Sequence, residues 1–371
     1  MFHQNSFRIF TCILLPVLSV GVFALPSSAQ TMTMLPPFTS EGYISYPSAV
    51  SGDGNVIAGT ASNYQSMRAA KWMRDAGTQS YEISSFAGVN NGAPTGVSHD
   101  GSVIAGSNGA NSFRWTASSG TQDLGNIPSG WWSQANGVSG DGSVVVGQGN
   151  IVVDFNQGWN RAYRWTSSTG MQSIGSLHQW SHSNALGVNF DGSVIVGESF
   201  DQAFRWTSGS GMVGLGFLAG QSKSLASAVN SDGSMIIGHS GQSGFQWTST
   251  GGMQSLTGDY NGSYRPQSLT ADGSIIVGAL GYQSNWTAMI WANSNTAITL
   301  GEYLSAHSVS LTGWSSLTDA KGISADGRYI VGYGVYEGQQ RGFVADIGVI
   351  PAPGAIALLG MAGIFGTRRR R

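Results

Sequence analysis

The chain has 371 residues, of which 55 are glycine and only 10% are charged. An average soluble domain has about a quarter of its residues charged, so this composition excludes a fold of charged surface helices and favours short strands with tight turns. Five of the 17 basic residues lie in the two terminal segments; the other 12 face 19 acidic residues, and a net charge near −7 argues against nucleic acid as a partner.

Residues 1–29 have the pattern of a secretory signal peptide. Arg8 supplies a positive charge, an apolar run follows from Ile9 to Leu25, and small residues end at Ala29. We therefore expect the mature chain to begin near Gln30. The only cysteine, Cys12, lies inside this signal, so the exported chain would have neither a disulfide nor a cysteine nucleophile.

The segment from residue 30 to 348 repeats itself. Asp-Gly pairs recur at intervals of 40 to 54 residues, with their aspartates at Asp53, Asp100, Asp141, Asp191, Asp232, Asp272 and Asp326. An aromatic marker follows each pair, and it ends in Trp72, Trp115, Trp165, Trp206, Trp247 and Trp291; the seventh copy has Phe343 but no tryptophan. A repeat of this length indicates a propeller, a solenoid or an array.

Each repeat divides into four short strands. In the copy around Asp191 these are "ALGVN", "SVIVGE", "AFRWTS" and "GMVGLG". Four antiparallel strands in about 44 residues make one propeller blade, so we predict an all-β, seven-bladed β-propeller, with a β-solenoid as the alternative. The last repeat lacks its fourth strand, and "TMTMLPPF" stands unpaired before the first. We expect residues 31–36 to pair beside residues 342–346 and close the ring.

The repeated aspartates are interpreted as turn residues, because an Asp side chain caps its own turn and the following glycine accepts positive φ. The strand order then places the Asp-Gly turns on one face and the variable loops on the other. Six tryptophans hold the repeat position and should pack between blades. The other six fall in variable loops and are candidate binding residues for a glycan or protein, or covers for blade edges: Trp131, Trp132, Trp159, Trp180, Trp286 and Trp314.

Candidate catalytic groups are few. Glycoside hydrolysis needs two carboxylates held about 5 to 10 Å apart. The acids on or near the variable face show no spacing that marks a pair: Asp154, Glu198, Asp201, Asp259, Glu302 and Asp319. His178 and His182 could share a metal with Asp154, but a loop fixes no common face for them. We therefore expect no enzyme activity, no metal and no cofactor, and favour the loop from Glu198 to Gln202 as the binding element of its repeat.

Residues 349–371 combine a short proline motif, an apolar stretch and a basic end. The motif is Pro351, Ala352 and Pro353, the apolar stretch runs from Gly354 to Thr367, and the end is Arg368, Arg369, Arg370 and Arg371. The stretch is shorter than the roughly 20 residues of a full membrane span, and terminal arginines favour the cytoplasmic side. This arrangement resembles the PEP-CTERM sorting signal of Gram-negative bacteria, with Ala352 where that family usually has glutamate. The resemblance implies transient anchoring in the inner membrane and processing by an exosortase.

The repeats, from Met34 to Asp346, are similar to the HAF repeats of extracellular bacterial proteins. The similarity rests on "AFRWT" and "GMQSIG", and Arg161 and Gln202 stand where that family has histidine. Together the two resemblances predict an exported, non-enzymatic protein of the cell envelope, outer surface or extracellular matrix. It would be associated with exopolysaccharide or biofilm. The alternative is a propeller-based polysaccharide hydrolase or lyase.

Overall fold

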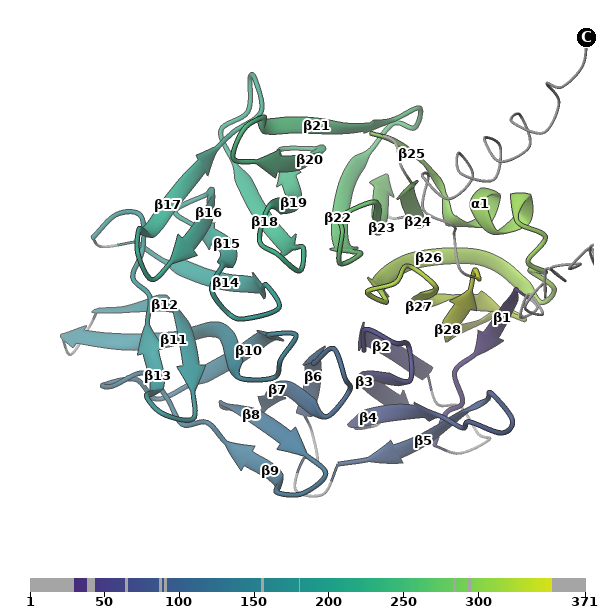
Figure 1. The fold of residues 1–371 in the computed structure, drawn as a ribbon, viewed down its shortest axis with the longest axis horizontal. Coiled ribbons are helices and arrows are strands. Elements are labelled where there is room, and N and C mark those ends of the chain that lie inside the picture. Colours follow the sequence, from purple (N-terminus) through teal and green to yellow (C-terminus); the bar gives the residue numbers. More distant parts are fainter. Residues whose placement is uncertain are drawn as a thin grey trace, which may run out of the picture.

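The computed structural model describes residues 30–38, 44–63, 66–86, 89, 92–154, 157–179, 181–282, 285–292 and 295–348. Small antiparallel sheets surround a common centre (Figure 1). The prediction of an all-β, propeller-like fold is confirmed; the solenoid alternative would need sheets stacked along one axis. The predicted signal peptide and sorting signal lie outside the described residues, and so does the apolar C-terminal helix. No helix within the described ranges is long and apolar enough to cross a membrane.

Four sheets follow one another along the chain, each built from four consecutive strands. The first contains β2 (Ile44–Val50), β3 (Val56–Asn63), β4 (Ser66–Arg74) and β5 (Tyr81–Ser85). The second contains β6 (Gly92–Val97), β7 (Val103–Asn108), β8 (Asn111–Thr116) and β9 (Gly120–Asp123). The third contains β10 (Ser133–Val138), β11 (Val144–Asp154), β12 (Gln157–Thr166) and β13 (Gly170–Ser173). The fourth contains β14 (Ser183–Val188), β15 (Ile195–Ser199), β16 (Gln202–Thr207) and β17 (Gly211–Gly216).

The next two repeats join into one eight-stranded sheet. One half contains β18 (Ser224–Val229), β19 (Met235–Ser240), β20 (Ser243–Thr248) and β21 (Gly252–Gly258). The other half contains β22 (Ser263–Leu269), β23 (Ile275–Tyr282), β24 (Asn285–Ala292) and β25 (Thr296–Thr299). The halves meet where β21 runs parallel to β25, with Thr257 opposite Thr296. The repeat pattern did not predict this junction.

The last sheet joins the two ends of the described chain. Its order is β1 (Thr31–Met34), β28 (Gln339–Asp346), β27 (Tyr329–Tyr336) and β26 (Trp314–Ile323). β1 pairs antiparallel with β28, from Thr31 opposite Asp346 to Met34 opposite Phe343. The predicted pairing of the N-terminal strand with residues 342–346 is therefore present, and it covers an edge that would otherwise be exposed.

The Asp-Gly pairs form turns, as predicted. In each turn the aspartate Oδ1 accepts the backbone N–H two residues on, as Asp191 does from Ser193 at 3.0 Å. The following glycine has positive φ, which is 72° for Gly192. A further glycine is required where the second strand passes the bulged first strand. A Cβ on Gly197 would lie 2.0 Å from the Asn184 carbonyl oxygen.

A closed ring of backbone hydrogen bonds links the seven Asp-Gly turns around the centre. In each turn the carbonyl oxygen of the residue before the aspartate accepts a backbone N–H from one neighbouring turn. A backbone N–H of the same turn donates to the neighbouring turn on its other side. Donor and acceptor pairs are Gly52 and His99, His99 and Gly140, Asp141 and Phe190, Phe190 and Ser231, Ser231 and Ala271, Ala271 and Ala325, and Ala325 and Gly52, at 2.8 to 3.2 Å.

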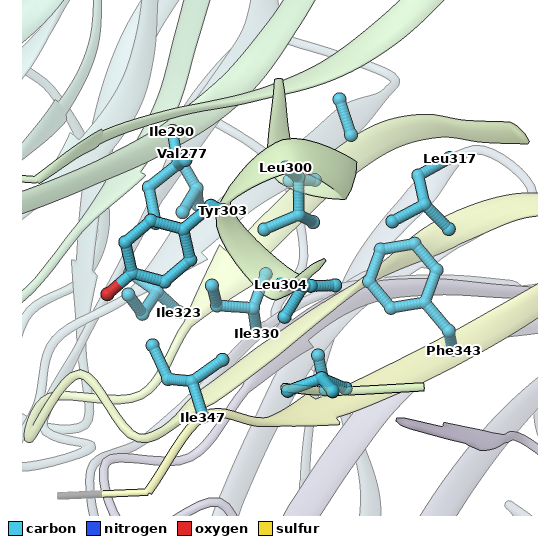
Figure 2. Packing of buried hydrophobic residues seen from close by; sticks show 14 of the residues in the cluster. Val277, Ile290, Leu300, Tyr303, Leu304, Leu317, Ile323, Ile330, Phe343 and Ile347 are labelled. Carbon is cyan, nitrogen blue, oxygen red and sulfur yellow. The ribbon is translucent and has the colours of Figure 1, made fainter. Parts of the chain in front are cut away.

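The core lies between neighbouring sheets. The second strand of a repeat is buried on both faces, because a sheet packs on each side of it, as in β7. The helix α1 (Leu300–Ala306) was not predicted; it packs against β24, β25 and β26 and places Leu300, Tyr303 and Leu304 in one cluster with Phe343 of β28 (Figure 2). Of the repeat tryptophans, Trp72, Trp165 and Trp291 are buried as predicted, whereas Trp115, Trp206 and Trp247 are half-buried.

Candidate functional site

A cavity of about 500 Å³ opens between the third and fourth sheets, on the face that carries the variable loops. It lies between the β11–β12 and β15–β16 hairpins. Its lining combines two carboxylates, a histidine, two aromatic rings and several amide or hydroxyl groups: Gln148, Trp159, Ser181, His182, Ser183, Asn184, Glu198, Phe200 and Asp201. Such a mixture of apolar surface and convergent polar groups is typical of a ligand site.

The β15–β16 hairpin brings two acidic residues to this cavity. Ser199 pairs with Gln202, so the loop consists of Phe200 and Asp201 alone. Both have positive φ, 52° and 62°, as a mirror-image two-residue turn requires. Glycine, asparagine and aspartate suit these positions better than phenylalanine does. The hairpin therefore holds a strained aromatic residue at the cavity mouth, and such strain is frequent at functional sites.

The two carboxyl groups experience different environments. Burial raises the pKa of Glu198 above its ordinary value; the charge of Asp201 raises it further, and that of Lys223 lowers it. Asp201 is more exposed, with 56% of its side chain accessible, and it forms an ion pair with Lys223 at 3.1 Å. A half-buried carboxyl with a raised pKa is suited to act as an acid, and an exposed carboxyl beside it can serve a second role.

His182 supplies a hydrogen-bond donor. Its Nδ1 accepts the backbone N–H of Asn160 at 3.1 Å, so the neutral ring carries its proton on Nε2. The ring meets the edge of Trp159, with 5.1 Å between centroids. The Trp159 indole N–H is buried and has no hydrogen-bond partner among the described residues.

A buried arginine holds the loop that carries His182. Arg161 is only 5% exposed, and its guanidinium donates to the carbonyl oxygens of Gln179, at 2.9 Å, and Ser181. The main chain of His182 is fixed in turn, because its carbonyl accepts the Ser199 hydroxyl at 3.1 Å. This wall of the cavity is therefore rigidly connected to β12 and β15.

The six tryptophans predicted to bind do not gather in one place. Trp159 lines the cavity. Trp131, on a loop, and Trp286, near the start of β24, are 64% and 47% exposed, and Trp132 is half-buried. Trp314 packs on Tyr336 and Phe343, with centroids 5.2 and 5.7 Å apart, so it covers the sheet as the alternative expected. Trp180 lies outside the described residues.

Most of the other candidate acids and histidines either make contacts that stabilise the fold or lie outside the cavity lining. Glu302 forms a capping box with Thr299 at the start of α1. Asp319 is buried, and it bonds to Lys321 at 2.7 Å and to Gln267 at 2.6 Å. Asp259 is not in the cavity lining, and the side chain of Asp154 is outside the described set. His178 meets the Phe200 ring, at 4.9 Å between centroids.

Sequence spacing missed the convergence of Gln148 with the two acids, because Gln148 lies in β11 of the third sheet and the acids lie in the fourth. It also did not show that His182 and Asn184, at the start of the fourth sheet, lie beside them. One signal was available. The corresponding hairpin loops β7–β8, β19–β20 and β27–β28 contain Gly109, Gly241 and Gly338, each with positive φ. The β15–β16 loop has Phe200 and Asp201 instead, and a missing glycine at such a position indicates a role for the side chains.

Neither a protein-family model nor a curated protein matches the chain. Solved structures do match its fold. An oligogalacturonate lyase in complex with manganese is 14% identical, with a TM-score of 0.56 over 85% of this chain and 96% of that one. An oligogalacturonate lyase from Vibrio parahaemolyticus is 12% identical, with a TM-score of 0.54 and the same coverage of each chain. At these identities the similarity concerns the fold.

These comparisons correct two predictions from the sequence. A non-enzymatic surface or matrix protein was expected, yet both of these solved structures are enzymes, and the expected absence of enzyme activity is overturned with it. The physical reason lies in the β15–β16 hairpin. Its tight turn brings Glu198 and Asp201 into one cavity with His182, a convergence that the linear spacing of acids does not reveal.

Proposed function

We propose that the chain is a polysaccharide-cleaving enzyme whose active site is the cavity between the third and fourth sheets. The observation that carries this proposal is the presence of Glu198 and Asp201 in one cavity, the first half-buried with a raised pKa and the second exposed. Aromatic rings of Trp159 and Phe200 flank the pair, and aromatic side chains offer flat surfaces to sugar rings.

Hydrolysis is the reaction that this geometry favours. The protonated carboxyl of Glu198 donates its proton to the glycosidic oxygen as the bond to that oxygen breaks. The carboxylate of Asp201 takes a proton from the water that adds to the anomeric carbon, and Glu198 is protonated again from solvent. The Nε2–H of His182 holds a sugar oxygen in place. One water is consumed, and a new reducing end is formed.

Elimination is the second candidate, and the fold similarity to two oligogalacturonate lyases favours it. In that reaction ionised Glu198 removes the proton beside the carboxylate of an acidic sugar, a carbon–carbon double bond forms as the C–O bond to the neighbouring sugar breaks, and the departing oxygen takes up a proton. No water is consumed. One of those lyases contains manganese. In the described part of this chain, no group of three or more His, Cys, Asp or Glu side chains is placed to hold a metal ion, so no step here is assigned to a metal.

The test is cleavage by the Glu198→Gln variant. Wild-type protein is incubated with neutral and acidic polysaccharides, and both reducing ends and unsaturated products are measured. We expect reducing ends, with a loss of about 10²-fold or more in rate for Glu198→Gln. Glu82→Gln, which changes an exposed acid on β5, is the control and should keep full activity. Unsaturated products would select elimination. Unchanged cleavage by Glu198→Gln would contradict the assignment of this site.

The same proposal includes export and a seven-bladed ring. Seven blades result when the eight-stranded sheet is divided at its β21–β25 junction, and the seven linked Asp-Gly turns support that division. The signal-like residues 1–29 and the PEP-CTERM-like residues 349–371 support export, transient anchoring in the inner membrane and processing by an exosortase-type enzyme. The protein would then act at the cell envelope or outside the cell. The intact mass of protein isolated from its host tests both cleavages.

A further inference from the structure

Both ends of the described chain lie at one point on the Asp-Gly face of the ring. The Gln30 side-chain amide donates to the Ile347 carbonyl oxygen at 2.9 Å, so the two ends are side by side. The Ile347 N–H donates in turn to the Arg328 carbonyl oxygen at 2.9 Å. Arg328 follows the last Asp-Gly turn, at Asp326. The chain therefore leaves the last sheet beside this turn and not beside the variable loops.

Side-chain contacts hold this exit point. The Arg328 guanidinium donates to both carboxylate oxygens of Asp346, each at 2.8 Å, and Asp346 is only 7% exposed. Its Oδ1 atom also accepts the Gly348 N–H at 3.0 Å. Because a buried carboxylate is costly without its partners, these contacts keep the last described residues on the Asp-Gly face.

The Glu198 cavity lies on the opposite face and on the opposite side of the ring. It opens among the variable loops, between the third and fourth sheets. In one direction from the last sheet, the first three sheets precede it; in the other direction, the eight-stranded sheet and the fourth sheet do (Figure 1). The exit point and the cavity are thus separated both across the ring and through its thickness.

The segment after the exit point is shorter than the ring is thick. Residues 349–353 separate Gly348 from the apolar stretch that begins at Gly354, and these six steps along the chain extend to at most about 22 Å. The eight residues of β28 run from the variable face to the Asp-Gly face over about 26 Å. A membrane that contains the apolar stretch can therefore lie against the Asp-Gly face, but it cannot reach the variable face.

We propose that residues 349–371 hold the ring with its Asp-Gly face toward a phospholipid bilayer and with the Glu198 cavity away from it. This orientation rests on the proposed anchoring through the C-terminal segment, and it does not require cleavage at Glu198. It leaves the cavity open to polymers outside the membrane while the protein is still anchored.

Two exposed alanines in loops provide matched positions for the test. Ala76 lies in the turn that joins β4 to β5, on the Asp-Gly face. Ala219 lies in the loop that joins β17 to β18, on the variable face. This loop ends at Ser224, whose N–H donates to the Asp201 carbonyl oxygen at 2.9 Å. Neither alanine lines the cavity.

Each alanine is replaced by cysteine in the chain from Gln30 onward, which keeps every described residue and has no other cysteine, since only Cys12 occurs in the sequence. The cysteine carries a fluorescent donor, and the protein is reconstituted into phosphatidylcholine vesicles with acceptor-labelled lipid in both leaflets. We expect energy transfer from Ala76→Cys to exceed that from Ala219→Cys several-fold. Equal transfer, or greater transfer from Ala219→Cys, would overturn the orientation.

Flotation of the vesicles tests the anchoring separately. The chain with Ile356→Arg and Leu359→Arg has two charges in the apolar stretch and should no longer float with the vesicles. Failure of the unchanged chain to float, or flotation of the double variant, would refute the anchoring and the orientation together. Flotation with reversed energy transfer would retain the anchoring and refute the orientation alone. Neither measurement depends on cleavage, so a protein without enzyme activity would refute the proposed reaction and leave the orientation in place.

Discussion

At the scale of single residues, the protonation of Glu198 decides what the cavity can do. Burial is the largest cause of its raised pKa, the charge of Asp201 adds to it, and the charge of Lys223 opposes both. In hydrolysis Glu198 must carry a proton, so activity should fall as pH rises through its pKa. Lys223 is not in the cavity lining, and it therefore offers a way to move this pKa without touching the substrate.

Lys223→Gln should shift the alkaline limit of activity to higher pH. Removing the ammonium removes the influence that lowers the pKa of Glu198, so the protonated carboxyl persists to higher pH. The pH profile of kcat measures the shift, and Lys223→Arg, which keeps the charge, should leave the profile in place. Movement of the limit to lower pH in Lys223→Gln would contradict the role of Glu198 as the acid. If elimination is the reaction, Glu198 must be ionised, and the acidic limit should move instead.

At the scale of elements, the strands and turns could be predicted because each repeat carries its own signals. The four strands predicted around Asp191 correspond to β14 to β17, and the pairing of residues 31–36 followed from counting strands at both ends. The seven-residue helix α1 was missed although Thr299 and Glu302 form a capping box, since it lies in a stretch interpreted as a loop. The cavity was missed because it depends on how two sheets pack, which no spacing along the chain records.

In the β15–β16 hairpin, Phe200 should lower the stability of the fold and strengthen substrate binding. Phe200 occupies the first loop position with a φ of 52° and is 65% exposed. Phe200→Asn should raise the free energy of unfolding by about 1 kcal/mol, because asparagine tolerates this backbone conformation and little buried surface is lost. It should also raise KM more than it lowers kcat, since the ring flanks the cavity without joining the carboxyl pair.

The two-residue loop of the β7–β8 hairpin, which has glycine at its first position, provides the converse control. Gly109 holds the first loop position of β7–β8 with a φ of 66°, and a Cβ there would meet no atom within 4 Å. Gly109→Ala should therefore destabilise by about 1 kcal/mol through the backbone alone. Chemical unfolding of both variants measures the two changes. A destabilised Phe200→Asn would show that the phenylalanine stabilises the hairpin by contacts that outweigh the strain.

At the scale of the whole molecule, the ring depends on how its last sheet is completed. β1 supplies the outer strand, and the residues after it continue the connection: Leu35 N–H donates to the Gly342 carbonyl at 2.9 Å, and the Trp72 indole donates to the Pro36 carbonyl at 2.8 Å. Arg328 and Asp346 form a two-pronged ion pair at 2.8 Å beside Arg74 of the first sheet. The seam between first and last sheets is thus held by groups far apart in the sequence.

Leu35→Ala should open this seam locally, whereas the same truncation of a buried leucine elsewhere in the ring should not. Leu35 is fully buried among Trp72, Tyr329 and Val344, and its truncation should cost about 3 kcal/mol. Leu256→Ala is the matched control, because Leu256 is 1% exposed in β21, away from the seam. Hydrogen exchange should show faster opening of β28 and β4 together in Leu35→Ala and only of strands near β21 in the control. Identical exchange patterns in the two variants would mean that the ring opens as one cooperative unit, with no weaker seam where β1 closes it.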